Sequence, residues 1–251
     1  MDSSIWKNNF DAIYCLSLAD NKERREDCVS DFTRVGIMDS GIFHWKITVR
    51  NEFYKYIWTN PNLRAEPGWF NNTTALNCTM GHYEIIKECL AMGYEHVLIL
   101  EDDCRFHKDS SVIETYLNNI PDYDICLFDK FIPIDKTPFN VAKETKRVND
   151  YYFDFDTVKL WSCGCYALSR KGMDMLVKFQ EYIYRPADHS INKVDNLGRV
   201  LTRDDLKRVA SIENLAVQEM FGKKYASEQA RLLDQKIYDG IADRKNYNVK
   251  L

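Results

Sequence analysis

The sequence lacks the features that mark several large classes of protein. Its 251 residues include only 6 prolines and 10 glycines, too few for a fibrous or low-complexity chain. No stretch approaches the roughly 18 consecutive apolar residues that a membrane-spanning helix needs. The 34 basic and 38 acidic residues nearly balance, for a net charge of −4, and do not supply the concentrated basic surface that nucleic acid binding requires. We therefore expect a folded globular protein that does not bind a nucleic acid polymer.

Eight cysteines would suit a disulfide framework in a secreted protein, but their surroundings favour free thiols. The opening residues, MDSSIWK, have no apolar region of the kind found in secretory signals. Several cysteines lie in apolar segments such as IYCLSL, IIKECL and DICLF, where a free cysteine packs as a small hydrophobic residue. Cys163 and Cys165 have no second Cys or His pair at zinc-site spacing. The sequence thus predicts a cytoplasmic protein, without a signal peptide, whose cysteines pack in the core.

Strand-like and helix-like segments alternate along the chain. Short apolar runs predict strands, and amphipathic stretches with capping or stop residues predict helices. The predicted strands are 13–18, 42–49, 97–100, 124–128 and 161–169, and the predicted helices are 21–35, 80–92, 110–119 and 170–180. This alternation is typical of an α/β domain with a mostly parallel central sheet flanked by helices.

The remaining segments complete one domain rather than forming a second. Residues 51–75 are predicted to be a long, mostly irregular loop, and residues 129–160 to be irregular or hairpin-like. The charged tail from about 203 has a helical pattern. There is no internal repeat and no linker rich in Pro, Gly or Ser. We therefore predict a single domain over 1–251 with a helical C-terminal segment.

The run LILEDD is the segment most informative about chemistry. An apolar strand delivers Glu101, Asp102 and Asp103 to its carboxyl end, which is where open α/β sheets bind ligands. Three adjacent carboxylates repel one another and suit a hard cation such as Mg²⁺ or Mn²⁺, which would neutralise a departing diphosphate. A solvated acidic turn is the equally common alternative, and the spacing alone does not separate the two.

Several motifs together resemble glycosyltransferase family 25, which includes lipooligosaccharide and collagen-type galactosyltransferases. IYCLSLADNKERRED resembles the family's first strand and Arg-bearing helix, and LILEDD its metal motif. NCTMGHYEIIKE resembles its Gly-Cys-x-x-Ser-His helix start, GCYALSRKGMDML its Gly-x-x-Tyr-x-x-Ser-x-x-Gly segment, and RPADH its Pro-x-Asp. LAVQEMF…YAS is more weakly similar to a later Gln…Ser segment. The motifs follow the family's order, although Ser17 stands where the family has Asn and Gly81 where it has Ser.

The resemblance implies a GT-A type fold and an inverting hexosyltransferase. The donor would be a UDP-sugar, most often UDP-galactose, bound with Mn²⁺ or Mg²⁺. The acceptor would be a hydroxyl of a glycan, of a lipid-linked sugar or of a protein side chain, which allows peripheral contact with a membrane. The C-terminal segment of about 185–251 would lie on the acceptor side. Two alternatives compete. One is a catalytically silent member of the fold that binds glycans or acts as a scaffold. The other is a nucleotidyltransferase, which would need a Gly-rich phosphate loop that SLADNKERR does not provide.

The predicted site residues combine the resemblance with local chemistry. Asp103 is predicted to bind the metal directly, with support from Glu101 and with Asp102 close to the donor. The Pro-x-Asp resemblance makes Asp188 the candidate base, and adjacency makes His189 a further metal ligand; a carboxylate paired with Arg185 is the alternative for Asp188. The predicted donor-binding residues also include His82, near a helix start, and Arg24 and Arg25, after the first strand. Tyr166 and Trp161 are predicted to stack on the substrate. Ser169 is a weaker candidate for substrate contact, because its main expected role is to cap a helix.

Overall fold

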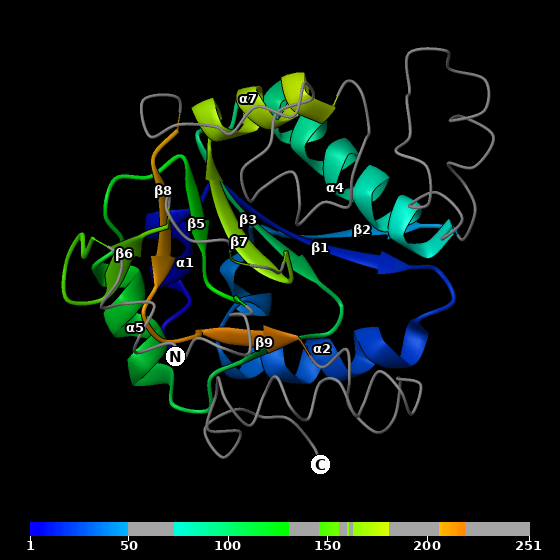
Figure 1. Cartoon of the computed structure of the whole chain (residues 1–251). Coiled ribbons are helices and arrows are strands. Elements are labelled where there is room, and N and C mark those ends of the chain that lie inside the picture. The colour runs from blue at the N-terminus through cyan, green and yellow to red at the C-terminus, as the bar shows by residue number, and fades with distance from the viewer. Residues whose placement is uncertain (50–72, 131–145, 156–159, 161–162, 181–205, 219–251) are drawn as a thin grey trace.

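A mixed sheet of seven strands forms the centre of the molecule (Figure 1). The computed structural model describes residues 1–49, 73–130, 146–155, 160, 163–180 and 206–218. The sheet has the strand order β2-β1-β3-β7-β5-β8-β6. Its strands are β1 (Ala12–Leu18), β2 (Phe43–Thr48), β3 (His96–Glu101), β5 (Ile125–Leu127), β6 (Tyr152–Asp154), β7 (Cys165–Ser169) and β8 (Arg208–Ser211). Five of them run in one direction, and β6 and β7 run in the other.

Helices cover both faces of this sheet, so the predicted α/β class is confirmed. On one face lie α4 (Thr73–Met92) and α7 (Arg170–Gln180), which pack against each other. The other face carries α1 (Ser4–Asn9), α2 (Lys22–Arg34) and α5 (Ser110–Asn118). Alternate residues of β1 enter the two cores, Tyr14 on the α4 side and Cys15 on the α2 side. Because the central strands are buried on both faces, they read as continuous apolar runs.

The predicted helical tail is wrong in the part that the structure describes. Residues 208–211 form β8, which pairs with β5, and Ala216–Gln218 form β9. β9 pairs with β4 (Cys104–Phe106) in a separate antiparallel ribbon. The short apolar segments around Val209 and Val217 are buried, and pairing with existing strands outweighs the local helical pattern. Residues 219–251 lie outside the described part of the chain.

The predicted helix at 80–92 exists but begins earlier, at Thr73. As a result His82 lies in the middle of α4, and the prediction that it sits near a helix N-terminus is wrong. Gly81 explains how closely this helix approaches the sheet, since a Cβ there would lie 2.5 Å from Leu16 Cδ1. The 3-10 turn η1 (Met38–Ser40) connects α2 to β2. Helix α1 was not predicted, and β6 lies in the segment 129–160 that was predicted to be irregular or hairpin-like. All eight cysteines are free thiols, as predicted.

Candidate active site

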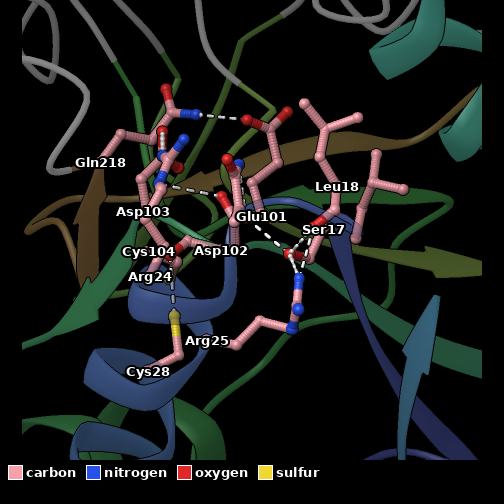
Figure 2. A network of polar contacts seen from close by, with 12 residues as sticks. Ser17, Leu18, Arg24, Arg25, Cys28, Glu101, Asp102, Asp103, Cys104 and Gln218 are labelled. Atoms are coloured by element: carbon pink, nitrogen blue, oxygen red, sulfur yellow. Dashed lines mark hydrogen bonds and ion pairs between the residues drawn. The ribbon is translucent and has the colours of Figure 1, made fainter. Parts of the chain in front are cut away.

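The acidic run lies where β3 ends and the chain turns into β4 (Figure 2). Glu101 is the last residue of β3, and Leu16 of the parallel neighbour β1 pairs with it. Asp102 and Asp103 follow in the turn and are each only 5% exposed. The first segment of α2 reaches over this edge and brings Arg24 and Arg25 to it. The sequence correctly placed the carboxylates at the carboxyl end of the central strands, but the structure does not leave them as a solvated turn.

Asp102 is held by side chains from the end of β1 and the start of α2. Its Oδ2 accepts hydrogen bonds from Ser17 Oγ at 2.7 Å and from Asn21 Nδ2 at 3.1 Å. Its Oδ1 lies 3.2 Å from Arg24 Nε. Both oxygens are therefore engaged by protein groups, which fixes the turn that carries Asp103.

Asp103 differs from Asp102 because only one of its two carboxylate oxygens contacts a protein group that neutralises it. Arg24 Nη2 lies 2.6 Å from Oδ2, while Oδ1 is buried and has no hydrogen-bond partner within the described residues. Burial raises the pKa of Asp103 to about 7; Arg24 opposes this rise, and the charges of Glu101 and Asp102 add to it. An unmatched buried carboxylate oxygen is costly to keep, and a hard cation is the kind of ligand that would satisfy it. Asp103 therefore fits the role of metal ligand.

Glu101 has a different environment, made of a histidine, two thiols and an amide. Its Oε1 lies 3.0 Å from His82 Nε2 and from Cys163 Sγ, and 3.3 Å from Cys78 Sγ. Its Oε2 accepts a hydrogen bond from Gln218 Nε2 at 2.9 Å. Since protein groups already surround both oxygens, Glu101 is not free to share a hard cation with Asp103 in this arrangement.

The His82–Glu101 contact is an ion pair between a buried histidine and a partly buried carboxylate. Burial alone would raise the pKa of Glu101, but the hydrogen bond and charge of His82 lower it to about 2. Burial would lower the pKa of His82, but Cys78 and Glu101 raise it to about 10. The second ring nitrogen, Nδ1, lies 2.9 Å from the hydroxyl of Tyr166, which burial keeps protonated by raising its pKa. Tyr166 therefore supports His82 from within the core, a position in which it does not stack on a ligand.

The two adjacent arginines have separate roles. Arg24 joins the site through its ion pairs with Asp102 and Asp103. Arg25 donates instead to Ser17 Oγ and to the carbonyl oxygens of Leu18 and Ala19. It thereby holds the end of β1, and the structure gives it no direct contact with the carboxylates.

Ser169 lies at the opposite edge of the sheet from the acidic run, because β7 runs antiparallel to β3 and Ser169 pairs with His96. Its hydroxyl accepts from the Gly172 amide at 3.1 Å, which confirms the predicted cap of α7. It also donates to Asp124 Oδ1 at 2.9 Å. The structure thus does not bring Ser169 to the site. Asp188, His189 and Trp161 lie outside the described residues, and their roles remain predictions.

Sequence reasoning missed several side chains that complete the site. They come from five separate segments and include Ser17, Asn21, Cys78, Cys163 and Gln218. Gln218 had a weak signal in the resemblance of its segment to a family motif. Gly164 makes room for it, because a Cβ at that position would lie 2.2 Å from Gln218 Cγ. Cys78 lies in NCTMGHYEIIKE, which resembles a family motif, whereas no local pattern placed Cys163 against Glu101.

Comparison with known proteins identifies the family. A family model described as glycosyltransferase family 25 (LPS biosynthesis protein) matches residues 10–191, which is most of the chain. The chain belongs to glycosyltransferase family 25. A search of curated protein sequences gives no match. The protein is therefore a glycosyltransferase by family, and the GT-A expectation rests on that membership.

Solved structures show only distant similarity. They include a mannose-1-phosphate geranyltransferase from Thermus thermophilus (9% identity, 80% of this chain and 72% of that chain, TM-score 0.39). An inositol-1-phosphate CTP transferase from T. maritima has 14% identity, covering 93% and 99%, with a TM-score of 0.38. The galactosyltransferase LgtC, in complex with donor and acceptor sugar analogs, has 8% identity, covering 90% and 95%, with a TM-score of 0.36. Within the described part of the chain, no helix is long and apolar enough to cross a membrane.

Proposed function

We propose that this family 25 glycosyltransferase is a metal-dependent, inverting enzyme that transfers a hexose from a UDP-sugar to a hydroxyl acceptor. UDP-galactose is the proposed donor, and a lipopolysaccharide-type glycan is the proposed acceptor in view of the family description. One observation carries the proposal. Asp103 presents a buried, unmatched carboxylate oxygen at the carboxyl end of β3, where α/β sheets bind their ligands.

In this proposal Asp103 would hold Mn²⁺ or Mg²⁺. The ion would supply neutralisation of the charge that develops on the departing UDP diphosphate. Asp102 would orient the turn, since both of its oxygens are already fixed by Ser17, Asn21 and Arg24. Arg24, with a side chain 20% exposed, would hold Asp103 ionised and in position. Its charge acts on Asp103 without occupying Oδ1.

Inversion requires a base that removes the proton of the acceptor hydroxyl on the face opposite the leaving diphosphate. Asp188 is the proposed base, on its match to the family's Pro-x-Asp motif. His189 is the proposed further metal ligand on adjacency alone.

The proposal is tested with a donor screen on the purified protein. UDP-galactose, UDP-glucose and UDP-N-acetylglucosamine are each incubated with Mn²⁺ and an acceptor library, and UDP release is measured with and without EDTA. The expected result is metal-dependent release above the rate of donor hydrolysis with one donor, UDP-galactose, and a β linkage in the product by NMR. If no UDP-sugar is turned over and UDP with Mn²⁺ does not raise the melting temperature, the chain is a silent member of its family.

A further inference from the structure

Four side chains that can each bind a metal ion converge at the start of the acidic run. They are Cys78, His82, Glu101 and Cys163, and their ligand atoms all lie within 4.8 Å of one another. His82 and Cys163 are buried, and Cys78 and Glu101 are partly exposed. The transferase chemistry proposed above gives the two thiols no role.

Rigid elements position these ligands from distant parts of the sequence. Cys78 and His82 are four residues apart on α4, so they lie on the same face of that helix. Glu101 ends β3, and Cys163 lies just before β7. The two strand ends are joined by the hydrogen bond from the Glu101 amide to the Gly164 carbonyl at 3.0 Å. A ligand bound by all four side chains would therefore tie α4 to the ends of two central strands.

The four ligand atoms are close enough to meet at one tetrahedral zinc ion once Glu101 Oε1 moves a few tenths of an ångström away from the groups that it now contacts. Zinc binds Cys sulfur at about 2.3 Å and His nitrogen or carboxylate oxygen at about 2.0–2.2 Å, which separates ligand atoms by roughly 3.3–3.8 Å. Glu101 Oε1 lies 3.0 Å from His82 Nε2, 3.0 Å from Cys163 Sγ and 3.3 Å from Cys78 Sγ. Thiolate, imidazole and carboxylate are all ligand types that Zn²⁺ binds, and the two sulfurs distinguish this set from the all-oxygen sets that Mg²⁺ and Mn²⁺ prefer.

Neighbouring side chains orient the cluster, as hydrogen-bond partners of the ligands do in zinc proteins. His82 Nδ1 faces the Tyr166 hydroxyl at 2.9 Å, which turns Nε2 toward the other three ligands. Gln218 Nε2 donates to Glu101 Oε2 at 2.9 Å, which turns Oε1 toward them. Both supporting groups are buried, Tyr166 at 1% and Gln218 at 4% exposed.

From this geometry we propose that Cys78, His82, Glu101 and Cys163 form a structural Zn²⁺ site that fastens α4 to the carboxyl end of β3. The site is separate from the donor-bound cation at Asp103 and goes beyond the proposed function. Metal binding displaces protons from both thiols and from His82. A four-ligand site leaves no open position, so the zinc stabilises the fold and does not activate substrate.

The test measures metal binding by the full chain in the absence of any sugar donor. The chelator-treated protein is titrated with Zn²⁺ against a chromophoric competitor, and with Co²⁺ as a spectroscopic probe. We expect one tightly bound Zn²⁺ per chain, a rise in melting temperature on zinc addition, and thiolate-to-cobalt and tetrahedral d–d absorption bands. Cys163→Ala abolishes these bands. The matched control Cys89→Ala, a buried cysteine on α4 outside the cluster, keeps them.

Two further measurements keep the test decisive if Cys163→Ala fails to fold. Tyr166→Phe removes the hydroxyl that orients His82 and should weaken zinc affinity about 10–100-fold while the protein remains folded. In the wild type, zinc should protect Cys78 from alkylation, as read by mass spectrometry. Absence of zinc binding, equal affinity in Tyr166→Phe, or unchanged Cys78 alkylation would overturn the proposal and leave the thiols as hydrogen-bond donors to Glu101. A zinc-free chain that still releases UDP refutes this site alone, whereas zinc binding without transfer refutes the proposed function alone.

Discussion

Asp103 and Asp124 are buried aspartates at opposite ends of the strands of the same sheet, and their carboxylates differ in how many hydrogen bonds they accept. Asp124, just before β5, accepts from Ser169 Oγ at 2.9 Å, from the Lys207 amide at 2.8 Å and from Lys171 Nζ at 3.1 Å. All of these contacts hold secondary structure together. Asp103 has one ion pair, to Arg24, and a second oxygen with no hydrogen-bond partner in the described chain.

The contacts of Asp124 suit a carboxylate that stabilises the fold, and those of Asp103 suit the cation ligand of the function proposed above. Burial is the same for both, since Asp103 is 5% and Asp124 is 6% exposed. What differs is how completely the protein satisfies the oxygens, and an unmet buried oxygen costs stability unless function requires it. Mutating each aspartate and measuring both activity and stability tests this interpretation.

The largest expected effect is that of Asp103→Asn on activity. The substitution keeps the shape but removes the charge that would hold the cation, so kcat should fall about 10²–10³-fold, the cost of losing one group that stabilises transition-state charge. UDP release from UDP-galactose with Mn²⁺ measures it. The free energy of unfolding from urea titration should change little or rise. Full activity in this variant would show that the cation binds elsewhere.

Asp124→Ala should show the opposite pattern. It leaves the Ser169 hydroxyl and the Lys207 amide without their acceptor, and each unmet buried group costs about 1–3 kcal/mol. We expect the free energy of unfolding to fall by about 2–4 kcal/mol. Activity per folded molecule at saturating donor should equal that of the wild type. A loss of kcat without a loss of stability would contradict the purely structural role of Asp124.

Lys130 extends the comparison because it is a buried ionisable group with hydrogen-bond partners in the protein. Its Nζ donates to Asn214 Oδ1 at 2.8 Å and to the Ile212 carbonyl at 3.2 Å. Burial lowers the pKa of Lys130 to about 7, although Asp129 and Glu213 oppose the shift. Between pH 7 and pH 10 the unfolded chain therefore binds more protons than the folded one, and stability rises with pH across that window.

Lys130→Met should remove that rise. Urea titrations of both proteins at intervals from pH 7 to pH 10 measure it. The free energy of unfolding of the wild type, relative to that of Lys130→Met, should rise across this window by about 3 kcal/mol. The transferase activity should be unaffected at fixed pH. Parallel pH profiles for the two proteins would mean that Lys130 is charged in the folded state throughout.

The smallest predicted effect is a difference in donor binding between the Arg24→Ala and Arg25→Ala variants. Arg24→Ala removes the ion pair to Asp103, and metal-dependent donor binding should weaken about tenfold, the equivalent of one charge-assisted hydrogen bond. Arg25→Ala should leave the donor KM unchanged, because its side chain contacts Ser17 and two carbonyls at the end of β1. Equal KM changes in the two variants would contradict these separate roles.

The sequence predicts the sheet well where strands are buried on both faces. Short, continuous apolar runs such as those of β1 and β3 are typical of buried strands. Once β3 is predicted, the position of Glu101, Asp102 and Asp103 at its carboxyl end follows. It fails for β8 and β9, short strands whose structure depends on pairing with β5 and β4.

Within the site, contiguous residues could be predicted and convergent ones could not. Glu101, Asp102 and Asp103 stand together in the sequence, and Arg24 follows a strand. Cys163 and Gln218 meet Glu101 across 62 and 117 residues, and no local pattern records that contact. His82 was predicted to bind the donor because it was expected at a helix N-terminus, but it lies in the middle of α4. It still contacts the acidic run, through its hydrogen bond with Glu101.

The most direct test of the role of Asp103 is the affinity for UDP with and without Mn²⁺, measured by calorimetry in the wild type, Asp103→Asn and Asp124→Ala. We predict that Mn²⁺ strengthens UDP binding at least tenfold in the wild type and Asp124→Ala, and has no effect in Asp103→Asn. Metal-dependent UDP binding that survives in Asp103→Asn would contradict the assignment of the unmatched oxygen as the cation ligand.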